Sequence, residues 1–563
     1  VEGSGGDADF DEDAEPDDGG FSLMAESPGD TGMLTGTLYA YVGPGETLDV
    51  AFVALTQAST ATVTVEGPGG ISESCTYPAG GSCSWPDLSG DPGVWRIHQQ
   101  AHVVNAAATW QVDVKDAAGE AIDGRVWSDH YRMRQAGSVA REDFTFWYQT
   151  EHGYLYEASY GGFNGINSDF QANATGVRYN GTCTSAYASI VGGDQVGETP
   201  DPDRSMADLG ECGDPYKIFF EPPAADLPAT APRWDGTTAW IVPPIADPEI
   251  TDVEFTPDST AVRSGTIDYA VENFTGQLRV EIDTNGDGTY DVTIPGSAVG
   301  GGGSVDFDGL DGNGDPVPAH RDLTVRVSIT QTGEVHFVNL DVEVREGGIE
   351  VLRLNGPDAG DATLYWNDTE LSTTHPCGTW DSVLDARDGV DSTGGVHWWD
   401  ADGCDGVSGG WGGARVIDEW TFVPVDESME ITVEGDDLEP WQCTPNGILF
   451  QYDGADGPTH MRIIDMVTGT HEDRHSIDGR AINGIAYNPL DHLIYGWDYV
   501  EREFVQISAD GGVRGLEVPE GFDPQWNINT AEFDANGTLW VAARTCCGPA
   551  STSTRRQKRT SRS

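Results

Sequence analysis

The segment from Asp283 to Asp291 carries the residue types and the spacing of a calcium-binding loop. Oxygen donors occur at the first, third and fifth positions, and a glycine that permits a sharp turn follows at the sixth. The predicted ligands are Asp283, Asn285, Asp287, Thr289 through its backbone carbonyl, and Asp291 through a water molecule. Hard oxygen ligands at this spacing suit Ca²⁺ and not a soft metal, so the sequence predicts a calcium site that stiffens a hairpin.

Two departures from the calcium-loop pattern leave a second interpretation open. Ile294 stands at the twelfth position, where a bidentate glutamate is expected, and the flanking residues alternate as strands rather than helices. We therefore expect a weak site, with a dissociation constant on the order of 10⁻⁴–10⁻³ M as in extracellular modules. The alternative is a solvated turn of Asp, Asn and Gly residues without a metal.

Tryptophans are concentrated in residues 347–435, which makes this segment the candidate ligand-binding site. The candidate residues are Trp398, Trp399, Asp400 and Trp411. Flat indole rings beside carboxylates suit the faces and edges of sugars. Core packing is the competing interpretation, and because neighbouring residues of a strand point to opposite faces, one of Trp398 and Trp399 is expected to be buried. A glycosidase would need two carboxyl groups about 5–9.5 Å apart, for which Asp400 and Glu419 are available.

His471, Glu472 and His475 match the HExxH pattern of zinc proteases. That chemistry needs a helix that presents both imidazoles on one face, with the glutamate as a base. The surrounding residues are instead typical of a connection between two strands, and no third histidine follows at the required offset. We therefore expect a chance match in a polar loop, keep a secreted zinc hydrolase as the alternative, and predict no catalytic residue.

The chain is strongly acidic, with 94 Asp and Glu residues against 29 Lys and Arg and a formal net charge of −65 at pH 7. Such a surface repels nucleic acid and anionic lipid and attracts divalent cations. No apolar run approaches the roughly 18 residues of a membrane span. A high-salt medium and a GC-rich genome that avoids lysine codons both explain this composition. We expect an extracellular or cell-surface protein with a protein or glycan ligand, no nucleic-acid partner and no organic cofactor.

The nine cysteines fall mostly in local pairs. The predicted disulfides join Cys75 to Cys83, Cys183 to Cys212, and Cys377 to Cys404, while Cys443, Cys546 and Cys547 are left without an assigned partner. No CxxC motif occurs, which argues against a thiolate zinc site. Disulfides within β domains indicate an oxidising compartment, and buried free thiols are the alternative.

Two segments resemble known families. The segment "VDFDGLDGNGDPVPAHRDLTVRVSI" at residues 305–329 resembles the immunoglobulin-like repeat of flagellar hook-cap and cell-surface proteins, with Phe307 in the usual tryptophan position. The segment "INGIAYNPLDHLIYGWD" at residues 482–498 is similar to the blades of bacterial extracellular β-propellers with YVTN- or NHL-like repeats. Strands expected to start at Ile448, Leu493 and Leu539 are 45 and 46 residues apart, a spacing typical of propeller repeats.

Glycine content and short alternating apolar runs indicate an all-β protein. Glycine makes up 73 of 563 residues, and each one costs a helix interior about 1 kcal/mol. Alternating runs bounded by Gly, Asp, Pro and Asn are typical of strands and turns. We expect tandem β-sandwich domains followed by an incomplete β-propeller of two to three blades, because a closed propeller needs about four to eight.

The expected segments follow these composition shifts along the chain. They are a disordered acidic leader (1–30), a β-sandwich (31–137), a β-rich domain with a disulfide loop (138–247), an immunoglobulin-like sandwich with the possible calcium hairpin (248–346), a Trp-rich β domain (347–435), the partial propeller (436–545) and a basic tail (546–563). Five of the 29 basic residues fall in the last nine positions, so the tail is interpreted as read out of frame, or as docking on the acidic body.

The whole chain resembles bacterial extracellular multi-domain surface proteins. That resemblance implies adhesion, scaffolding or display outside the cell, without catalysis. The alternative is a secreted carbohydrate-binding or carbohydrate-active protein that uses the Trp-rich segment. The ligand, the anchoring mechanism, the oligomeric state and the natural ends of the chain are not specified by these patterns.

Overall fold

The computed structural model describes most of the chain, and every ordered element in the described part is a β-strand. The described residues are 23–24, 36–54, 60–102, 107–133, 141–165, 168–191, 204–205, 212–257, 263–317, 321–371, 378–381, 383–400, 410–413, 415–435, 438, 440–442, 446–455, 457–519, 522–534 and 536–544. This confirms the predicted all-β class. Within those ranges, no helix long and apolar enough to cross a membrane is found.

The largest sheet contains thirteen described strands. Its main path runs β28 (Val390–Asp391), β27 (Thr363–Trp366), β29 (Arg415–Val433), β25 (Leu323–Leu340), β13 (Ser168–Asn173), β10 (His130–Met133), β1 (Leu23–Met24), β8 (Ala107–Lys115), β3 (Thr47–Ala54) and β6 (Ser82–Leu88). Off this path, β15 (Ile190–Val191) pairs with β29, β22 (Gly276–Asp283) pairs with β25, and β23 (Val292–Ala298) pairs with β22. We call it the large sheet.

A second sheet of nine described strands lies opposite the large sheet. Its order is β26 (Val344–Arg353), β12 (Leu155–Asn164), β11 (Glu142–Gln149), β17 (Lys217–Phe219), β9 (Val126–Ser128), β2 (Thr37–Val42), β7 (Gly93–Ala101), β4 (Ala61–Gly67) and β5 (Ile71–Tyr77). We call it the facing sheet. All of the neighbouring strands in both sheets pair antiparallel, for example Phe146 on β11 with Ala158 on β12.

Aromatic side chains close the space between these two sheets. Phe146 on the facing sheet meets Phe170 on the large sheet edge to face at 5.4 Å, and Tyr148 meets Phe337 in the same way at 4.9 Å. Alternation drives this packing: in β3, Leu48, Val50 and Phe52 are buried and the residues between them are not. One apolar cluster runs from Leu23 to Val423, so segments 31–137, 138–247 and 347–435 contribute to a common core.

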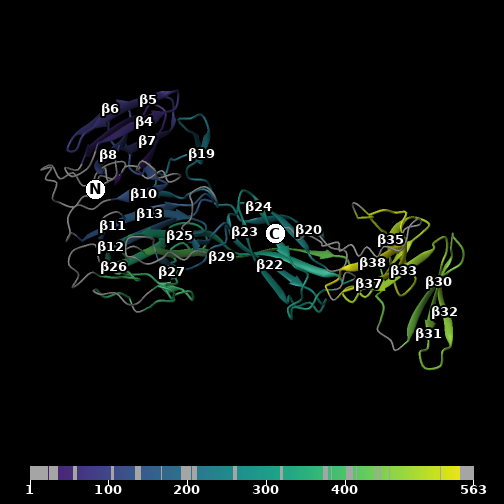
Figure 1. Cartoon of the computed structure of the whole chain (residues 1–563). Coiled ribbons are helices and arrows are strands. Elements are labelled where there is room, and N and C mark those ends of the chain that lie inside the picture. Colours follow the sequence, from purple (N-terminus) through teal and green to yellow (C-terminus); the bar gives the residue numbers. More distant parts are fainter. Residues whose placement is uncertain are drawn as a thin grey trace.

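Two unusually long strands carry the large sheet into a second packed body. β25 has 18 residues and β29 has 19, and they stay paired from Leu323 opposite Val433 to Leu340 opposite Val416. Register shifts between Ile329 and Gln331 and between Thr332 and Val335 mark a bulge midway along the pair, with one extra residue first on β29 and then on β25. Figure 1 shows both strands passing from the body formed by the large sheet and the facing sheet toward β22.

The second body is built on the far halves of those strands. A three-stranded sheet of β20 (Glu249–Pro257), β21 (Gly265–Glu272) and β24 (Gly302–Phe307) packs against β22, β23, β25 and β29 around a separate apolar cluster. Leu323, Val325, Val327 and Ile329, which alternate with polar residues in the sequence, are all completely buried in it.

Two hairpin-like pairs lie outside the main sheets. β14 (Arg178–Tyr179) pairs with β16 (Arg204–Ser205), and β18 (Thr230–Pro232) pairs with β19 (Thr238–Trp240). Residues of the β18–β19 hairpin pack with Tyr39, Trp127 and Phe219 of the facing sheet in a small cluster of their own. The hairpin therefore covers part of the outer surface of that sheet.

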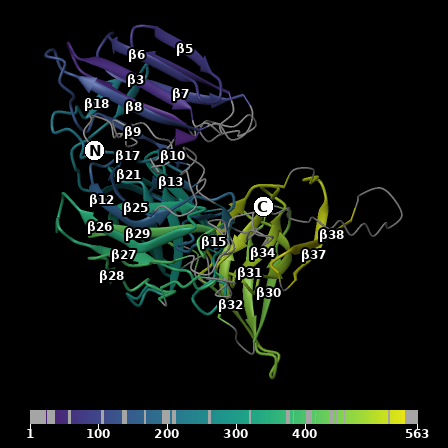
Figure 2. The same ribbon diagram turned by 90° about the vertical axis from the view of Figure 1, so that its left-hand side faces the viewer.

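The C-terminal part forms three small sheets. These are β30 (Gly447–Tyr452), β31 (Thr459–Ile464) and β32 (His471–Ile477); β33 (Ile482–Tyr487), β34 (Ile494–Asp498), β35 (Glu503–Ile507) and β36 (Val513–Leu516); and β37 (Asn527–Phe533) with β38 (Leu539–Arg544). β33 lies against both β30 and β37, and the three sheets form one group at an end of the molecule (Figures 1 and 2). The described strands make no closed ring, so a propeller stays a proposal.

Candidate functional site

The predicted calcium loop is a hairpin turn between β22 and β23. Asp283 is buried at its start, and its Oδ1 accepts the amide hydrogens of Asn285 at 3.1 Å and Gly286 at 2.7 Å. Its Oδ2 accepts the amide hydrogen of Gly288 at 2.8 Å. Gly286 and Gly288 both adopt positive φ, which the tight turn requires. The carboxylate of Asp283 therefore organises the turn through backbone amides.

The other predicted calcium ligands are also engaged within the loop. Asp291 accepts hydrogen bonds from the amide and hydroxyl of Thr284 at 2.8 and 2.7 Å, and although burial opposes its ionisation, these bonds hold the pKa of Asp291 below its usual value. Asn285, Asp287 and Thr289 lie on the exposed turn. Among the described residues, no three or more His, Cys, Asp or Glu side chains are grouped to hold a metal ion. Calcium binding here stays a prediction.

The Trp-rich segment packs into the core for the most part. Trp399 and Trp411 are completely buried, with ring centroids 5.5 Å apart, and the Trp399 indole N–H donates to the carbonyl of Val342 at 2.9 Å. This corrects their assignment as ligand-binding residues, because a buried ring has no free face for a sugar. Trp398 is half-buried, which confirms that only one of the adjacent pair enters the core. Asp400, also half-buried, accepts hydrogen bonds from the amide and hydroxyl of Thr379 at 2.7 and 2.6 Å.

Beside these tryptophans lies a buried group of charged side chains. We call Arg345, Asp368, His397 and Glu419 the inner cluster. His397 Nδ1 lies 2.6 Å from Glu419 Oε1, and its Nε2 lies 2.7 Å from Asp368 Oδ2. Both η nitrogens of Arg345 donate to the Glu419 carboxylate. Two cations thus face two carboxylates, which is the condition for burying charge at acceptable cost.

Aromatic rings enclose the inner cluster. The His397 imidazole stacks on Trp366 at 4.6 Å with an interplanar angle of 4°, and the Arg345 guanidinium lies 4.4 Å from the Trp399 ring centre. Burial alone would lower the pKa of His397, but the carboxylates of Asp368 and Glu419 outweigh it and raise that pKa to about 9. Burial likewise opposes ionisation of Glu419, yet Arg345 and His397 hold its pKa below the usual value. The imidazole is therefore a buried cation near neutral pH.

A second charged group lies on the other face of β29, and we call Glu334, His336 and Asp418 the outer cluster. His336 Nδ1 is 2.7 Å from Asp418 Oδ1, and its Nε2 is 3.3 Å from Glu334 Oε1. Burial lowers the pKa of His336, but Asp418 outweighs it and raises that pKa to about 10. Burial also raises the pKa of Asp418, and His336 opposes that effect.

The loop from Ala174 to Ile190 seals the outer cluster from solvent. The amide of Val177 donates to Asp418 Oδ2 at 2.9 Å. Gly176 sits directly over the pair: with φ of +57°, a Cβ there would lie 2.2 Å from His336 Nδ1 and 2.4 Å from Asp418 Oδ2. Only glycine can adopt this backbone conformation and also fit in the space available. The charged side chains of both clusters are buried, and their ion pairs join neighbouring strands.

Sequence reasoning did not find these clusters. It named Glu419 only as a possible glycosidase carboxylate with Asp400, and the burial of Glu419 against Arg345 removes that pairing. The available signal was the run "RVIDEWTF" at residues 415–422, where two acidic residues interrupt apolar ones without alternation. A strand covered on both faces produces such a run, since polar residues can face either core when they are paired.

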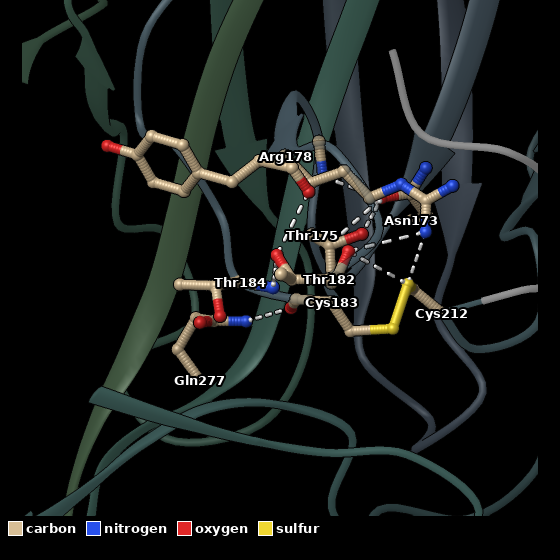
Figure 3. The surroundings of a disulfide bond; sticks show 10 residues. Asn173, Thr175, Arg178, Thr182, Cys183, Thr184, Cys212 and Gln277 are labelled. Carbon is tan, nitrogen blue, oxygen red and sulfur yellow. Dashed lines mark hydrogen bonds between the residues drawn. A yellow bond between two sulfur atoms is a disulfide. The ribbon is translucent and has the colours of Figure 1, made fainter. Parts of the chain in front are cut away.

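Two of the three predicted disulfides lie in the described part. Cys75–Cys83 joins β5, at the edge of the facing sheet, to β6, at the edge of the large sheet. Cys183–Cys212 closes the loop over the outer cluster, and Figure 3 shows Arg178 against Cys212 and Gln277 donating to the carbonyl of Cys183 at 2.8 Å. Because Gln277 belongs to β22, this bridge ties the first body to the second. The pair Cys377 and Cys404, and also Cys443, Cys546 and Cys547, lie outside the described residues.

The HExxH match lies on a strand. Residues 471–475 begin β32, where Glu472 is opposite Ile463 and His475 is opposite Met461 of β31. The helix that would bring both imidazoles to one zinc ion is therefore replaced by extended backbone. The expectation that this motif is a chance match agrees with that placement.

Among the comparisons with known proteins, one family model matches a C-terminal segment of the chain. Residues 455–557 match the model described as "Repeat of unknown function (DUF6923)", in agreement with the repeat seen in the sequence. No curated protein matches the chain. Solved structures that match include the tetra-tandem repeat in the extending region of a large adhesion protein, at 13% identity and a TM-score of 0.13, covering 81% of this chain and 99% of that chain.

A second solved structure that matches is native E. coli alpha-2-macroglobulin. The identity is 10% and the TM-score 0.11, over 89% of this chain and 37% of that chain. TM-scores this low do not establish a shared fold for either structure.

Proposed function

We propose that this chain is a non-catalytic extracellular scaffold or adhesion protein, which holds a binding surface at a distance from its point of attachment. The observation that carries the proposal is the continuity of β25 and β29, which stay paired through a bulge and belong to two separate cores. Strands shared by two bodies resist bending at the junction far better than a flexible linker does. Such a joint suits a protein that transmits position or force.

Contacts across the junction support the same proposal. Tyr156 donates its hydroxyl hydrogen to the carbonyl of Gly333 in the bulge at 2.8 Å, and Gln277 binds the disulfide loop. The charge of −65 supports a location in a medium rich in cations, and the two disulfides are consistent with an oxidising compartment. The proposed partners are an extracellular protein or a glycan, with calcium as a proposed stabilising ion.

The function is tested by immobilising the full chain and passing over it panels of extracellular matrix proteins and glycans. The expected result is saturable retention of at least one class, with the ligand recovered chemically unchanged. Retention should survive Glu472→Ala, because the HExxH match is not expected to act. Conversion of a retained ligand into a product, abolished by a single carboxylate substitution, would contradict the proposal.

Carbohydrate binding is the second candidate, and it has one specific observation in its favour. Trp398 is half-buried and lies two residues from Asp400, so part of an indole ring and a carboxylate share one region of the surface. In the glycan panel, Trp398→Ala should abolish retention, whereas Trp85→Ala, a half-buried tryptophan on β6, should not. Equal effects of the two substitutions would remove this candidate.

A further inference from the structure

Lys217 is a buried lysine with an unusual environment. It is one of three lysines in the chain, and it lies on the three-residue strand β17 with 4% of its side chain exposed. Its Nζ is 3.7 Å from the ring centre of Trp240 and 5.3 Å from that of Trp127. Within the described residues, no hydrogen bond to this amine is found.

The acidic group that pairs with Lys217 is the carboxyl of Asp129. β17 pairs with β9 so that Ile218 is opposite Ser128, which places Lys217 beside the next residue, Asp129. The Lys217 Nζ and Asp129 Oδ1 atoms are 4.0 Å apart. Oδ1 is buried and has no hydrogen-bond partner in the described part of the chain. The Tyr39 hydroxyl lies close enough to the same carboxyl group to affect its pKa.

Both groups are driven toward their neutral forms. Burial lowers the pKa of the Lys217 amine, and although Asp129 opposes this, the net direction is down. Burial raises the pKa of the Asp129 carboxyl against the opposing effect of Lys217. A neutral amine has a free electron pair and is a nucleophile, and a neutral carboxylic acid is an acyl donor, whereas an ammonium and a carboxylate are neither.

From this juxtaposition we propose that Lys217 and Asp129 become joined by an amide bond between Nζ and Cγ, forming a covalent cross-link within the chain. The Nζ electron pair attacks Cγ, and the bond from Cγ to the hydroxyl oxygen breaks. The hydroxyl takes up a proton released by the amine and leaves as water. No oxidant, reductant or co-reactant is needed, and the chain loses one molecule of water.

The position is suited to this reaction. Reacting atoms held about 3–3.5 Å apart form a near-attack arrangement. The Lys217 Nζ lies 4.0 Å from Oδ1, the oxygen bonded to the reacting Cγ of Asp129. The rings of Trp127 and Trp240 lie against the Lys217 amine and shield it from water, while 26% of the Asp129 side chain is exposed. The Tyr39 hydroxyl is placed to stabilise negative charge on the carboxyl oxygen as the bond forms.

The cross-link would lie at a weak point of the facing sheet. β17 has three residues, and it lies between β9 and β11 in the strand order. Few backbone hydrogen bonds therefore connect β2, β7 and β4 to β11 and β12 through this strand. An amide bond from β17 to the residue after β9 would prevent the two parts of the sheet from separating there. This inference does not depend on the proposed function.

The chain contains its own control for the chemistry. Lys115 contacts Asp49 more closely than Lys217 contacts Asp129, but 27% of the Lys115 side chain is exposed against 4% of Lys217, while Asp49 and Asp129 are similarly exposed, at 24% and 26%. The hydrogen bond to Asp49 raises the pKa of Lys115, so its amine stays protonated. If proximity alone decided the reaction, the cross-link would form at Lys115. If the amine must be neutral to react, it forms at Lys217 only.

The test is the intact mass of the full chain after denaturation and complete reduction of disulfides. The expected mass is lower than the sequence mass by one water, and a protease digest should yield one branched peptide that contains both Lys217 and Asp129. The full sequence mass, or a dehydrated chain whose branched peptide contains Lys115 instead, would overturn the proposal.

Variants separate the cross-link from other dehydration products. Lys217→Arg should restore the full mass, because guanidinium is not a nucleophile, whereas a cyclic imide at Asp129 would persist in that variant. Asp129→Asn should react with loss of ammonia instead of water. A water loss that remains in Lys217→Arg would contradict the proposal even if the wild-type mass agrees with it.

Discussion

Asp418 and Glu419 are neighbours on β29, and both are completely buried although they point to opposite faces of the sheet. Asp418 pairs with His336 beneath the disulfide loop, and Glu419 pairs with Arg345 between the large sheet and the facing sheet. One strand therefore joins three layers by charge pairs, with apolar packing around them. This arrangement makes the region around β29 the part of the structure most sensitive to substitution.

Breaking the inner cluster should destabilise the protein strongly. Arg345→Met leaves the Glu419 carboxylate with only His397 in a sealed site, and removal of one member of a buried pair costs about 3–5 kcal/mol. The free energy of unfolding, measured by urea titration, should fall by that amount. Arg387→Ala, which removes an exposed pair with Asp385, should leave the midpoint unchanged. A small effect of both substitutions would contradict the assignment of a buried ion pair.

Stability should fall as the pH rises through the alkaline range. The folded-state pKa of His397, about 9, lies above its ordinary value of 6.5, so the charged imidazole favours the folded state fully below pH 6.5. That contribution is lost as the pH approaches and passes 9, and it amounts to about 3 kcal/mol. Urea titrations at pH 6 and pH 9.5 measure it, and His397→Gln should reduce the difference. His102→Gln, at an exposed position, should preserve the difference.

Gly176 should tolerate no side chain. Gly176→Ala combines a positive φ with a clash against His336 and Asp418, and a loss of about 3 kcal/mol in unfolding free energy is expected. Gly181→Ala is the matched control, because its φ is +72° but no atom lies within 4 Å of the added methyl. Its cost should be about 1–2 kcal/mol, from backbone strain alone. Equal losses in the two variants would show that the clash is absent.

Asp283 should stabilise its hairpin with or without calcium. Asp283→Ala removes the acceptor of three backbone amides and should lower the melting temperature in the presence of a chelator. The sequence pattern further predicts a rise in the wild-type melting temperature at millimolar Ca²⁺, which this variant should lack. An unchanged wild-type curve on adding Ca²⁺ would refute the metal site and leave the hydrogen-bonded turn in place.

Local pattern predicted the strand class and some of the core, but not how strands are shared. The alternation of Leu323, Val325, Val327 and Ile329 correctly indicated one buried face. The polar residues 330–334 that follow are typical of a turn, yet they form a bulge in which Gly333 takes a φ of +58°. Nothing local to these residues distinguishes a strand that ends from one that bends and enters a second core.

The candidate site was missed for a related reason. Tryptophans beside acidic residues favour a sugar-binding surface as readily as a core, because the two differ only in which neighbours cover the ring. Trp399 and Trp411 are covered by residues that come from distant parts of the chain, such as Val342. The partners of Glu419 are similarly remote, so no spacing in the sequence could reveal the cluster.

The most direct test of a rigid, continuous scaffold is native-state amide hydrogen exchange on β25 and β29. If the strands run unbroken through the bulge, peptides covering 323–329 and 335–340 should open together, with the same opening free energy and the same response to denaturant. Substantially weaker protection on one side of the bulge, with independent opening of the two halves, would contradict the account.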